Sequence, residues 1–331
     1  MNKLVTICAV LFLMLTVSGV AQAIAIDTVS VGNAGNLADS TTYGSVAYNY
    51  NIGKYEVTAG QYAAFLNAKA TTDTYSLYNT NMSSTETGSG ITRDGTSGSY
   101  TYSVASAFVN RPVNYVSFWD ATRFTNWLHN GQGNGDTENG AYTLTVDGIA
   151  NNTITRNAGA TWAVTSSDEW YKAAYYKSGG TNVGYWDYAT QSDVAPGRDM
   201  TDASGNNANN IMDFVSEIII GGGAWPIDSG KYTTVAGEFQ KSESAYGTFD
   251  QGGNVWEWND AITANGRLMW GGGFGAESDA LRAGSYLMGY SASAEVNDTG
   301  FRVSVIPEPA TMTLLGIGAI VLRRKTQKDK K

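Results

Sequence analysis

Helical periodicity appears in three segments of the chain, and each follows a polar residue that can cap a helix. Apolar side chains recur three and four residues apart in YEVTAGQYAAFLNAKA (55–70), VSFWDATRFTNWLHNG (116–131) and WAVTSSDEWYKAAYYKSGG (162–180). Each segment has the spacing of a capping box, in Thr58 with Gln61, Ser117 with Asp120, and Ser166 with Glu169. The pattern predicts three helices that begin at these caps, and glycines near 131 and 179 end two of them.

The rest of the chain reads as short aromatic segments separated by Gly, Asn and Asp, which predicts brief strands on much irregular backbone. Residues 178–250 show no long helical or strand pattern. The polar tract 71–103 reads as a surface excursion that could contain a hairpin. A domain with this much loop needs more than apolar burial to hold it together, and a bound metal is the natural candidate.

The two ends of the chain carry targeting patterns. Residues 1–23 hold one lysine, an uncharged apolar run and small residues before Ile24, which is typical of a cleavable signal peptide. Residues 306–331 contain PEP at 307–309, continue with an apolar run too short to cross a bilayer unaided, and end with basic residues. This order resembles the PEP-CTERM sorting signal, which implies exosortase-type machinery as a partner. An ordinary C-terminal helix is the alternative.

Cysteine and charge narrow the classes of function. The single cysteine, Cys8, lies in the signal peptide, so the mature chain has no disulfide and no thiol. Without Lys3, the six basic residues of the tail and Asp329, 14 basic and 29 acidic residues remain, a net charge of −15. Such a chain repels nucleic acid and anionic lipid and attracts cations, so we expect membrane contact only through the C-terminal tail.

Six ordered motifs resemble the formylglycine-generating enzyme family, also called sulfatase-modifying factors. They are IGKYEVTAGQYAAFLNA, RPVNYVSFWDATRFTNWL, WAVTSSDEWYKAAYY, YGTFDQGGNVWEW, RLMWGGGF and GFRVSV. The resemblance runs from about Val29 to Val305 and implies an α+β fold of the C-type-lectin-like kind, with small antiparallel sheets and extensive loops. We therefore expect one domain over 24–305, between the signal peptide (1–23) and the sorting tail (306–331).

The chemistry of that family does not carry over with the motifs. Generating enzymes bind copper through two cysteines between the glycine turn and the GFR segment, and here the interval 271–302 contains none. A second branch, the iron-dependent sulfoxide synthases, uses several histidines, whereas this chain has only His129, which we expect to be a partly exposed helix-end residue. No copper or iron site and no catalytic residue are visible.

The segment DQGGNVWEWND (250–260) suggests a calcium site. Strand alternation directs Trp256 and Trp258 to one face and Glu257 to the other. Asp250 lies seven residues before Glu257, and the glycines between them free carbonyl groups, which suits the oxygen ligands that calcium prefers. The resemblance implies a structural Ca²⁺ held by Asp250, the carbonyls of Gly253 and Val255, and Glu257. The alternative is that Glu257 is a solvated or backbone-capping acid.

A second calcium site of the family begins with a segment similar to NANNIMDF, in which Asn210 and the carbonyl of Ile211 would serve as ligands. The acid and aromatic residue that complete it have no clear counterpart, and Asp213 is a substitute for the acid. For Arg282 and Arg302 we expect buried or half-buried ion pairs, because arginine suits that geometry. Glu169 is expected to be a helix cap and not a general base.

These patterns favour an exported, surface-sorted, non-catalytic protein of the cell envelope or exterior, stabilised by calcium. Exposed tyrosines and tryptophans would suit a glycan or protein ligand. The alternative is an enzyme that modifies sulfatases or another exported client by a cysteine-independent mechanism. It would need a metal-competent cluster near 271–290, for which Glu277, Asp279 and Asp298 are the available acids. A third reading is a passive passenger on the sorting signal.

Overall fold

A computed structural model of the protein describes residues 23–211, 226–285 and 288–307. The predicted signal peptide up to residue 22, Asp213 and the apolar run of the sorting tail lie outside the described residues. Within those ranges, no helix is both long enough and apolar enough to cross a membrane.

The three predicted helices are present and begin at their predicted caps. They are α1 (Ala59–Lys69), α2 (Phe118–His129) and α4 (Ser167–Tyr175), and both reciprocal hydrogen bonds of the capping box form in each. The short helix α3 (Val146–Ala150) was not predicted from the periodicity, because five residues are too few to show one. Two 3₁₀ turns, η1 (Thr80–Ser83) and η2 (Ser278–Leu281), complete the helical elements of the described chain.

The strands form two small mixed or antiparallel sheets and one hairpin. The first sheet has the order β1-β2-β10-β5, from Thr28–Val31, Tyr50–Gly53, Val303–Val305 and Trp162–Val164. The second has the order β8-β7-β6-β9, from Met288–Tyr290, Gly266–Trp270, Trp256–Thr263 and Thr299–Gly300. All pairs are antiparallel except β6 with β9, which run parallel. The α+β class expected from the sequence is confirmed.

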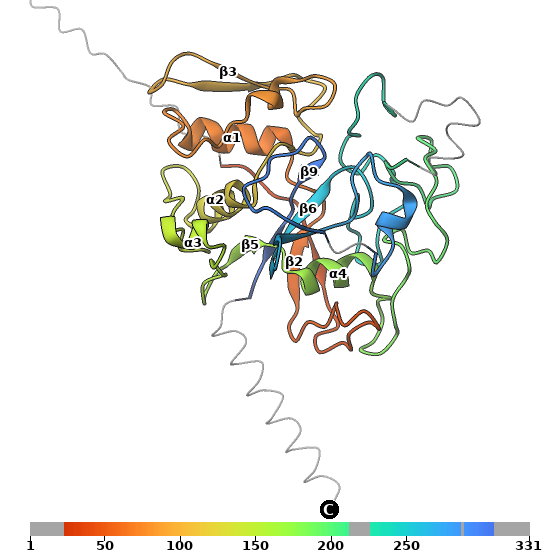
Figure 1. Cartoon of the computed structure of the whole chain (residues 1–331). Coiled ribbons are helices and arrows are strands. Elements are labelled where there is room, and N and C mark those ends of the chain that lie inside the picture. Colours follow the sequence, from red (N-terminus) through yellow and green to blue (C-terminus); the bar gives the residue numbers. More distant parts are fainter. Residues whose placement is uncertain (1–22, 212–225, 286–287, 308–331) are drawn as a thin grey trace, which may run out of the picture.

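The polar tract 71–103 contains η1 and the hairpin of β3 (Ile91–Asp94) and β4 (Thr101–Val104), as the sequence suggested. Figure 1 shows this hairpin lying over α1, with α2 on the other side of α1. On the opposite side of the molecule, the described parts of 178–250 form loops with only isolated bridges between them.

An aromatic cluster between α1 and α2 forms the centre of the main core. The ring centroids of Phe65 and Phe124 lie 5.4 Å apart, and Phe124 is also 5.4 Å from Phe301, which precedes β10. Trp258 of β6 is fully buried in the same cluster. Burying each such side chain stabilises the fold by roughly 1.5–3 kcal/mol. This core therefore fixes β6 and the segment before β10 against the two long helices.

Candidate functional site

Strand β6 separates its aromatic and acidic side chains, as alternation predicted. Trp258 is buried in the main core and Trp256 packs against that core, whereas Glu257 points to the opposite face, toward α4. The Glu257 side chain is fully buried, so it is not a solvated acid. The site around it is therefore built by β6, by α4 and by the segment that enters β10.

Glu257 forms a buried bidentate ion pair with Arg302. Its Oε2 accepts from Nε of Arg302 at 2.6 Å, its Oε1 accepts from Nη2 at 2.6 Å, and both side chains have no exposed surface. Nε1 of Trp170 donates a third hydrogen bond to Oε2 at 2.8 Å. Burial lowers the pKa of Arg302, but the charge and hydrogen bonds of Glu257 outweigh it and hold that pKa above its ordinary value. The predicted buried ion pair of Arg302 is thus confirmed.

Arg302 also binds two backbone segments and holds them beside β6. Its Nη1 donates to the carbonyl of Gly53 at 3.0 Å, and its Nη2 donates to the carbonyl of Phe249 at 2.9 Å. Gly53 ends β2, and Phe249 precedes Asp250, so the guanidinium fixes both segments relative to β6. All of these contacts are directed by the planar fork of donors that only arginine offers.

Asp250 lies beside this ion pair on a strained turn. Its backbone φ is +58°, and its Oδ2 accepts from the amide of Gly237 at 2.6 Å. Burial raises the pKa of Asp250 to about 6, and the nearby charge of Glu257 adds to that rise. Gly253 follows at φ +89°, where a Cβ would collide with the carbonyl of Asn209. The glycine is therefore required by backbone approach as well as by the turn.

Glu56 is a buried acid of this region that sequence reasoning missed. It is 2% exposed, and its Oε1 accepts from Nδ2 of Asn254 at 3.1 Å. Among the described residues, its Oε2 has no hydrogen-bond partner. Burial, reinforced by the charge of Asp250, raises the pKa of Glu56 well above its ordinary value. In the sequence, the only signal for Glu56 is its position just before Val57 and Thr58, where α1 is capped.

The first predicted calcium set is brought together only in part. Glu257 is committed to Arg302 and Trp170, so its oxygens are not free ligands as they stand. In the described part of the chain, no three acids, histidines or cysteines gather at metal-ligand spacing. The region nevertheless favours a cation, because burial and neighbouring acids raise the pKa of both Glu56 and Asp250, and a bound cation would offset this effect. Calcium at this site stays a prediction.

The second predicted set is described only at its first two residues. Asn210 is fully buried, its Nδ2 donates to the carbonyl of Ile211 at 3.0 Å, and its Oδ1 has no partner among the described residues. The residues that would complete this site follow in 212–225. They lie outside the described residues, as does the substitute Asp213.

The interval that carries the cysteines in generating enzymes is filled by apolar side chains here. Leu281 is 1% exposed and packs with Tyr188, Ala208 and the partly buried Ala276. The acids of this interval do not converge: Glu277 is the N-cap of η2 and Asp279 lies within η2, whereas Asp298 lies before β9, where burial raises its pKa. No acid trio for a metal forms within the described part of this interval.

Three side chains test other expectations from the sequence. His129 ends α2 half-buried, and its Nδ1 lies 2.8 Å from Oγ1 of Thr161, as expected of a structural helix-end residue. Glu169 caps α4 and also forms a bidentate ion pair with Arg156. The expectation for Arg282 was wrong in one respect. Its 2.8 Å ion pair with Asp187 is exposed, because η2 lies at the surface.

The expected display of aromatic residues is also corrected. Among the described residues, the large aromatic side chains that are exposed are Tyr75 and Tyr290, with 44% and 38% of their surface accessible. Most tyrosines and tryptophans are instead buried against one another; Trp170 and Trp270, for example, stack with their ring centroids 5.9 Å apart. The described aromatic residues therefore do not form a platform of many exposed rings for a sugar.

Comparison with known proteins bears on both the domain and the tail. The family model described as "Sulfatase-modifying factor enzyme 1-like domain" matches residues 28–305, and the model of the PEP-CTERM protein-sorting motif matches residues 305–325. No curated protein matches the chain. The sorting motif implies exosortase-type machinery as a partner, and export to the surface or envelope.

Solved structures with a similar fold share little sequence with the chain. The structure titled "Crystal Structure of CarF" has a TM-score of 0.52 at 18% identity, over 86% of this chain and 100% of that one. The Treponema denticola variable protein 1 has a TM-score of 0.51 at 16% identity, over 87% of this chain and 97% of that one. These similarities support the fold alone. The family model, which matches nearly the whole described chain, shows that the protein belongs to the sulfatase-modifying factor enzyme 1-like domain family.

Proposed function

We propose that this chain is an exported, envelope-sorted member of its family that acts as a non-catalytic binding or structural protein. The observation that carries the proposal is that the interval 271–302 contains no cysteine and no histidine. Where generating enzymes bind copper through cysteines, this chain has a packed apolar cluster around Leu281. Neither thiolate nor imidazole is available there to bind copper or iron or to act as a nucleophile.

The buried charges near this interval support the same proposal. Glu257 and Arg302 are hydrogen-bonded to each other, and Glu257 also accepts from Trp170, so they offer no free base. A general base must reach a substrate proton directly or through one water, and a fully buried ion pair does neither. These residues therefore serve to hold β6, α4 and the start of β10 together.

The direct test is oxidation of a client peptide. The purified exported chain is incubated with a cysteine peptide of the sulfatase type, oxygen and either copper or iron, and the peptide is analysed by mass spectrometry. An unchanged peptide, beside a generating enzyme that converts it, is the expected result. Conversion to formylglycine would refute the non-catalytic role and support the alternative of a cysteine-independent enzyme.

We further propose that a structural Ca²⁺ stabilises the turn 250–257. The ligands would be Asp250, the carbonyls of Gly253 and Val255, and an oxygen of Glu257 shared with Arg302. When bound, calcium would supply positive charge to a site in which acids outnumber cations. Hard carboxylate and carbonyl oxygens are the ligands that calcium prefers.

The test of calcium is a thermal unfolding series with calcium and with a chelator. At a hundredfold excess over its dissociation constant, calcium should stabilise the wild type by about 2.7 kcal/mol, or roughly 5–10 °C in a domain of this size. The Asp250→Asn variant should lose this shift, whereas Asp94→Asn, on the exposed hairpin, should keep it. An unfolding midpoint that calcium and chelator leave unchanged would remove calcium from the proposal.

A further inference from the structure

The sorting signal begins inside the first sheet, without a linker. The domain match ends at Val305, and the match to the sorting motif begins at the same residue. Val305 lies in β10 and is paired with Asn51 of β2. The amide of Ile306 still donates to the carbonyl of Thr161 at 2.9 Å, and Pro307, the first residue of PEP, comes next. The signal is therefore joined directly to a central strand of the domain.

This junction limits how far the signal can lie from the domain. An extended chain spans at most about 3.6 Å per residue, so the three residues of PEP (307–309) reach no more than about 11 Å beyond the sheet. A folded protein of even about 100 residues has a radius of gyration of about 13 Å, which exceeds that reach. An enzyme that surrounds the tripeptide must therefore touch the surface of the domain around Pro307.

A hollow of about 320 Å³ opens at this place. It is lined by the ends of β1 (30–32), β2 (49–51) and β10 (305–307). Val31 and Tyr50 are buried, whereas Ser30 and Asn49 are exposed. Figure 1 shows the described chain ending below β5, on the side of the molecule away from the hairpin of β3 and β4. The hollow thus lies beside the point where the signal leaves the domain.

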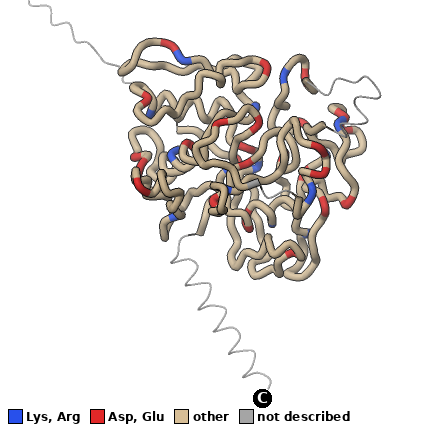
Figure 2. Tube along the Cα trace, in the orientation of Figure 1, with Lys and Arg blue, Asp and Glu red and all other residues tan. Residues whose placement is uncertain are grey.

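The hollow carries no charge, although the chain as a whole is acidic. None of its lining residues is Asp, Glu, Lys or Arg, whereas Figure 2 shows acidic residues along loops on several sides of the molecule. Two of its polar side chains bind each other, since Oγ of Ser30 donates to Oδ1 of Asn51 at 2.6 Å. Charged residues are depleted in the centres of protein interfaces. The hollow therefore suits a protein surface better than a small ion.

The outer edge of β1 adjoins the hollow and has free backbone groups. The amide of Lys54 donates to the carbonyl of Asp27 at 2.8 Å, and Thr28 is paired with Gly53. Because bonded and non-bonded pairs alternate in an antiparallel ladder, the N–H and C=O groups of Thr28 and Ser30 point away from β2. No hydrogen bond within the described chain uses these groups, and both residues are exposed. Such an edge can pair with a strand of another protein.

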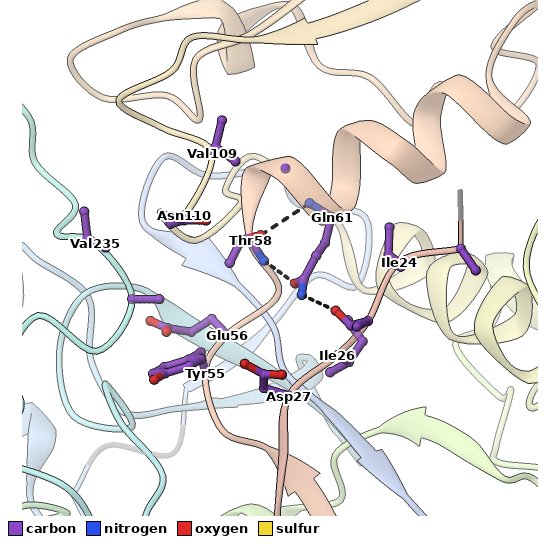
Figure 3. Close-up of a pocket in the computed structure, with 14 residues that line it drawn as sticks. Ile24, Ile26, Asp27, Tyr55, Glu56, Thr58, Gln61, Val109, Asn110 and Val235 are labelled. Carbon is purple, nitrogen blue, oxygen red and sulfur yellow. Dashed lines mark hydrogen bonds between the residues drawn. The ribbon is translucent and has the colours of Figure 1, made fainter. Parts of the chain in front are cut away.

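A second cleft, at the opposite end of β1, lacks these features. It has about 730 Å³ and is bounded by residues 23–27, the start of α1 and the chain near Val109 (Figure 3). The sorting signal does not begin there, and the one exposed carboxylate, that of Asp27, makes no binding site by itself. Val109 is 39% exposed on its wall, so this cleft provides a comparison position.

We propose that the hollow and the outer edge of β1 together form the surface that the exosortase-type sorting enzyme contacts while it binds the signal. The inference rests on the sorting part of the proposed function, and not on calcium or on the non-catalytic role. The hollow would receive an uncharged segment of the enzyme beside the bound PEP, and the edge of β1 would add backbone hydrogen bonds. The domain is then part of what the enzyme recognises.

The experiment is site-specific photo-crosslinking of the full chain in cells that produce an epitope-tagged exosortase. A photoreactive amino acid takes the place of Ser30 in the proposed surface, of Val109 in the second cleft, or of Thr311 in the signal. Position 311 should crosslink to the enzyme. Position 30 should do so at least about tenfold more than position 109, and Asn49→Arg should lower the yield at position 30 at least about tenfold, or about 1.4 kcal/mol.

Crosslinking at position 311 but not at position 30, or equal yields at 30 and 109, would overturn the inference and leave the sorting signal standing. No crosslink at position 311 would contradict the sorting function itself, and the inference with it. A crosslink from position 30 to a second copy of the chain, and not to the enzyme, would also overturn the inference, in favour of pairing between two β1 edges.

A second variant decides the question should Asn49→Arg fail to fold. Six Gly and Ser residues inserted between Ile306 and Pro307 add a reach of up to about 20 Å, so the enzyme can hold the signal away from the domain. The yield at position 30 should then fall at least about tenfold, because the contact is no longer imposed by the short junction. A yield that the insertion leaves unchanged would overturn the inference.

Discussion

Replacing Glu257 by Gln tests whether the buried ion pair holds the scaffold. The substitution keeps the size and one acceptor of the side chain but removes the charge opposite Arg302. The guanidinium would then stay fully buried, with its remaining bonds going to the neutral carbonyls of Gly53 and Phe249. A cation left in that position loses the interaction that offsets its desolvation.

The expected cost is large for a single substitution. Removing one partner of a buried pair costs about 3–5 kcal/mol, because the other charge remains without compensation. In a domain of this size, 1 kcal/mol moves the melting temperature by about 2–4 °C, so the melting temperature should fall by roughly 6–20 °C. The contribution of Trp170 is lost only in part, since Gln can still accept its hydrogen bond.

The assay is urea unfolding of the wild type and the variant, followed by both fluorescence and circular dichroism. Asp187→Asn is the matched control, because it breaks the ion pair with Arg282, which is exposed, and it should leave the midpoint unchanged. A double variant, Glu257→Gln with Arg302→Met, should recover part of the loss, since no charge is then left buried. A loss below about 1 kcal/mol for Glu257→Gln would refute the reasoning.

Three further outcomes can be measured in the same way. Burial raises the pKa of Asp120 to about 7, whereas the pKa of an unfolded Asp is about 3.9. The contribution of Asp120 to stability is therefore complete below about pH 3.9, and it is lost as the pH rises through about 7. Urea midpoints of Asp120→Asn should therefore change less between pH 6 and pH 8 than those of the wild type; equal slopes would contradict this pKa. Gly253→Ala should destabilise the protein by more than the roughly 1–2 kcal/mol of a left-handed alanine, because the new Cβ would collide with the carbonyl of Asn209. Gly98→Ala is the control, since Gly98 also has a positive φ, +95°, but has open space around it, and it should cost no more than that amount. Equal costs in thermal unfolding would argue against the collision. Trp170→Phe keeps the stacking on Trp270 but loses the hydrogen bond to Glu257. It should lower the free energy of unfolding in urea by about 1.5–3 kcal/mol, which is less than the loss expected for Glu257→Gln. A loss as large as that of Glu257→Gln would contradict this ranking.

Local signals predicted the helices and the direction of Glu257 correctly. A capping box needs only residues three apart, so Ser117 and Asp120 were sufficient to locate the start of α2. The alternation of a strand is also local, and it put Glu257 on the face opposite Trp258. Where the determinants lie within a few residues, the pattern of the chain decides the structure.

The partners of Glu257 could not be predicted in this way. Trp170 is 87 residues away in sequence and Arg302 is 45 residues away, and no local pattern relates them. The resemblance to a family suggested a metal at Glu257 but did not indicate that Arg302 is its partner; the metal stays a prediction. Glu56 shows the same limit, because its hydrogen-bond partner, Asn254, lies 198 residues further along the chain.

The position of Arg302 explains why charges are buried at the centre of a domain whose interval 271–302 contains neither cysteine nor histidine. A buried ion pair adds little net stability compared with apolar packing, so stability alone does not account for it. Its five directed donors do something that packing cannot: they set the end of β2, and the segment before Asp250, at fixed distances from β6. The first of these segments leads into Glu56, and the second leads into the proposed calcium turn. One guanidinium thus positions the turn where we propose that calcium binds, and this arrangement needs neither a thiol nor a catalytic metal.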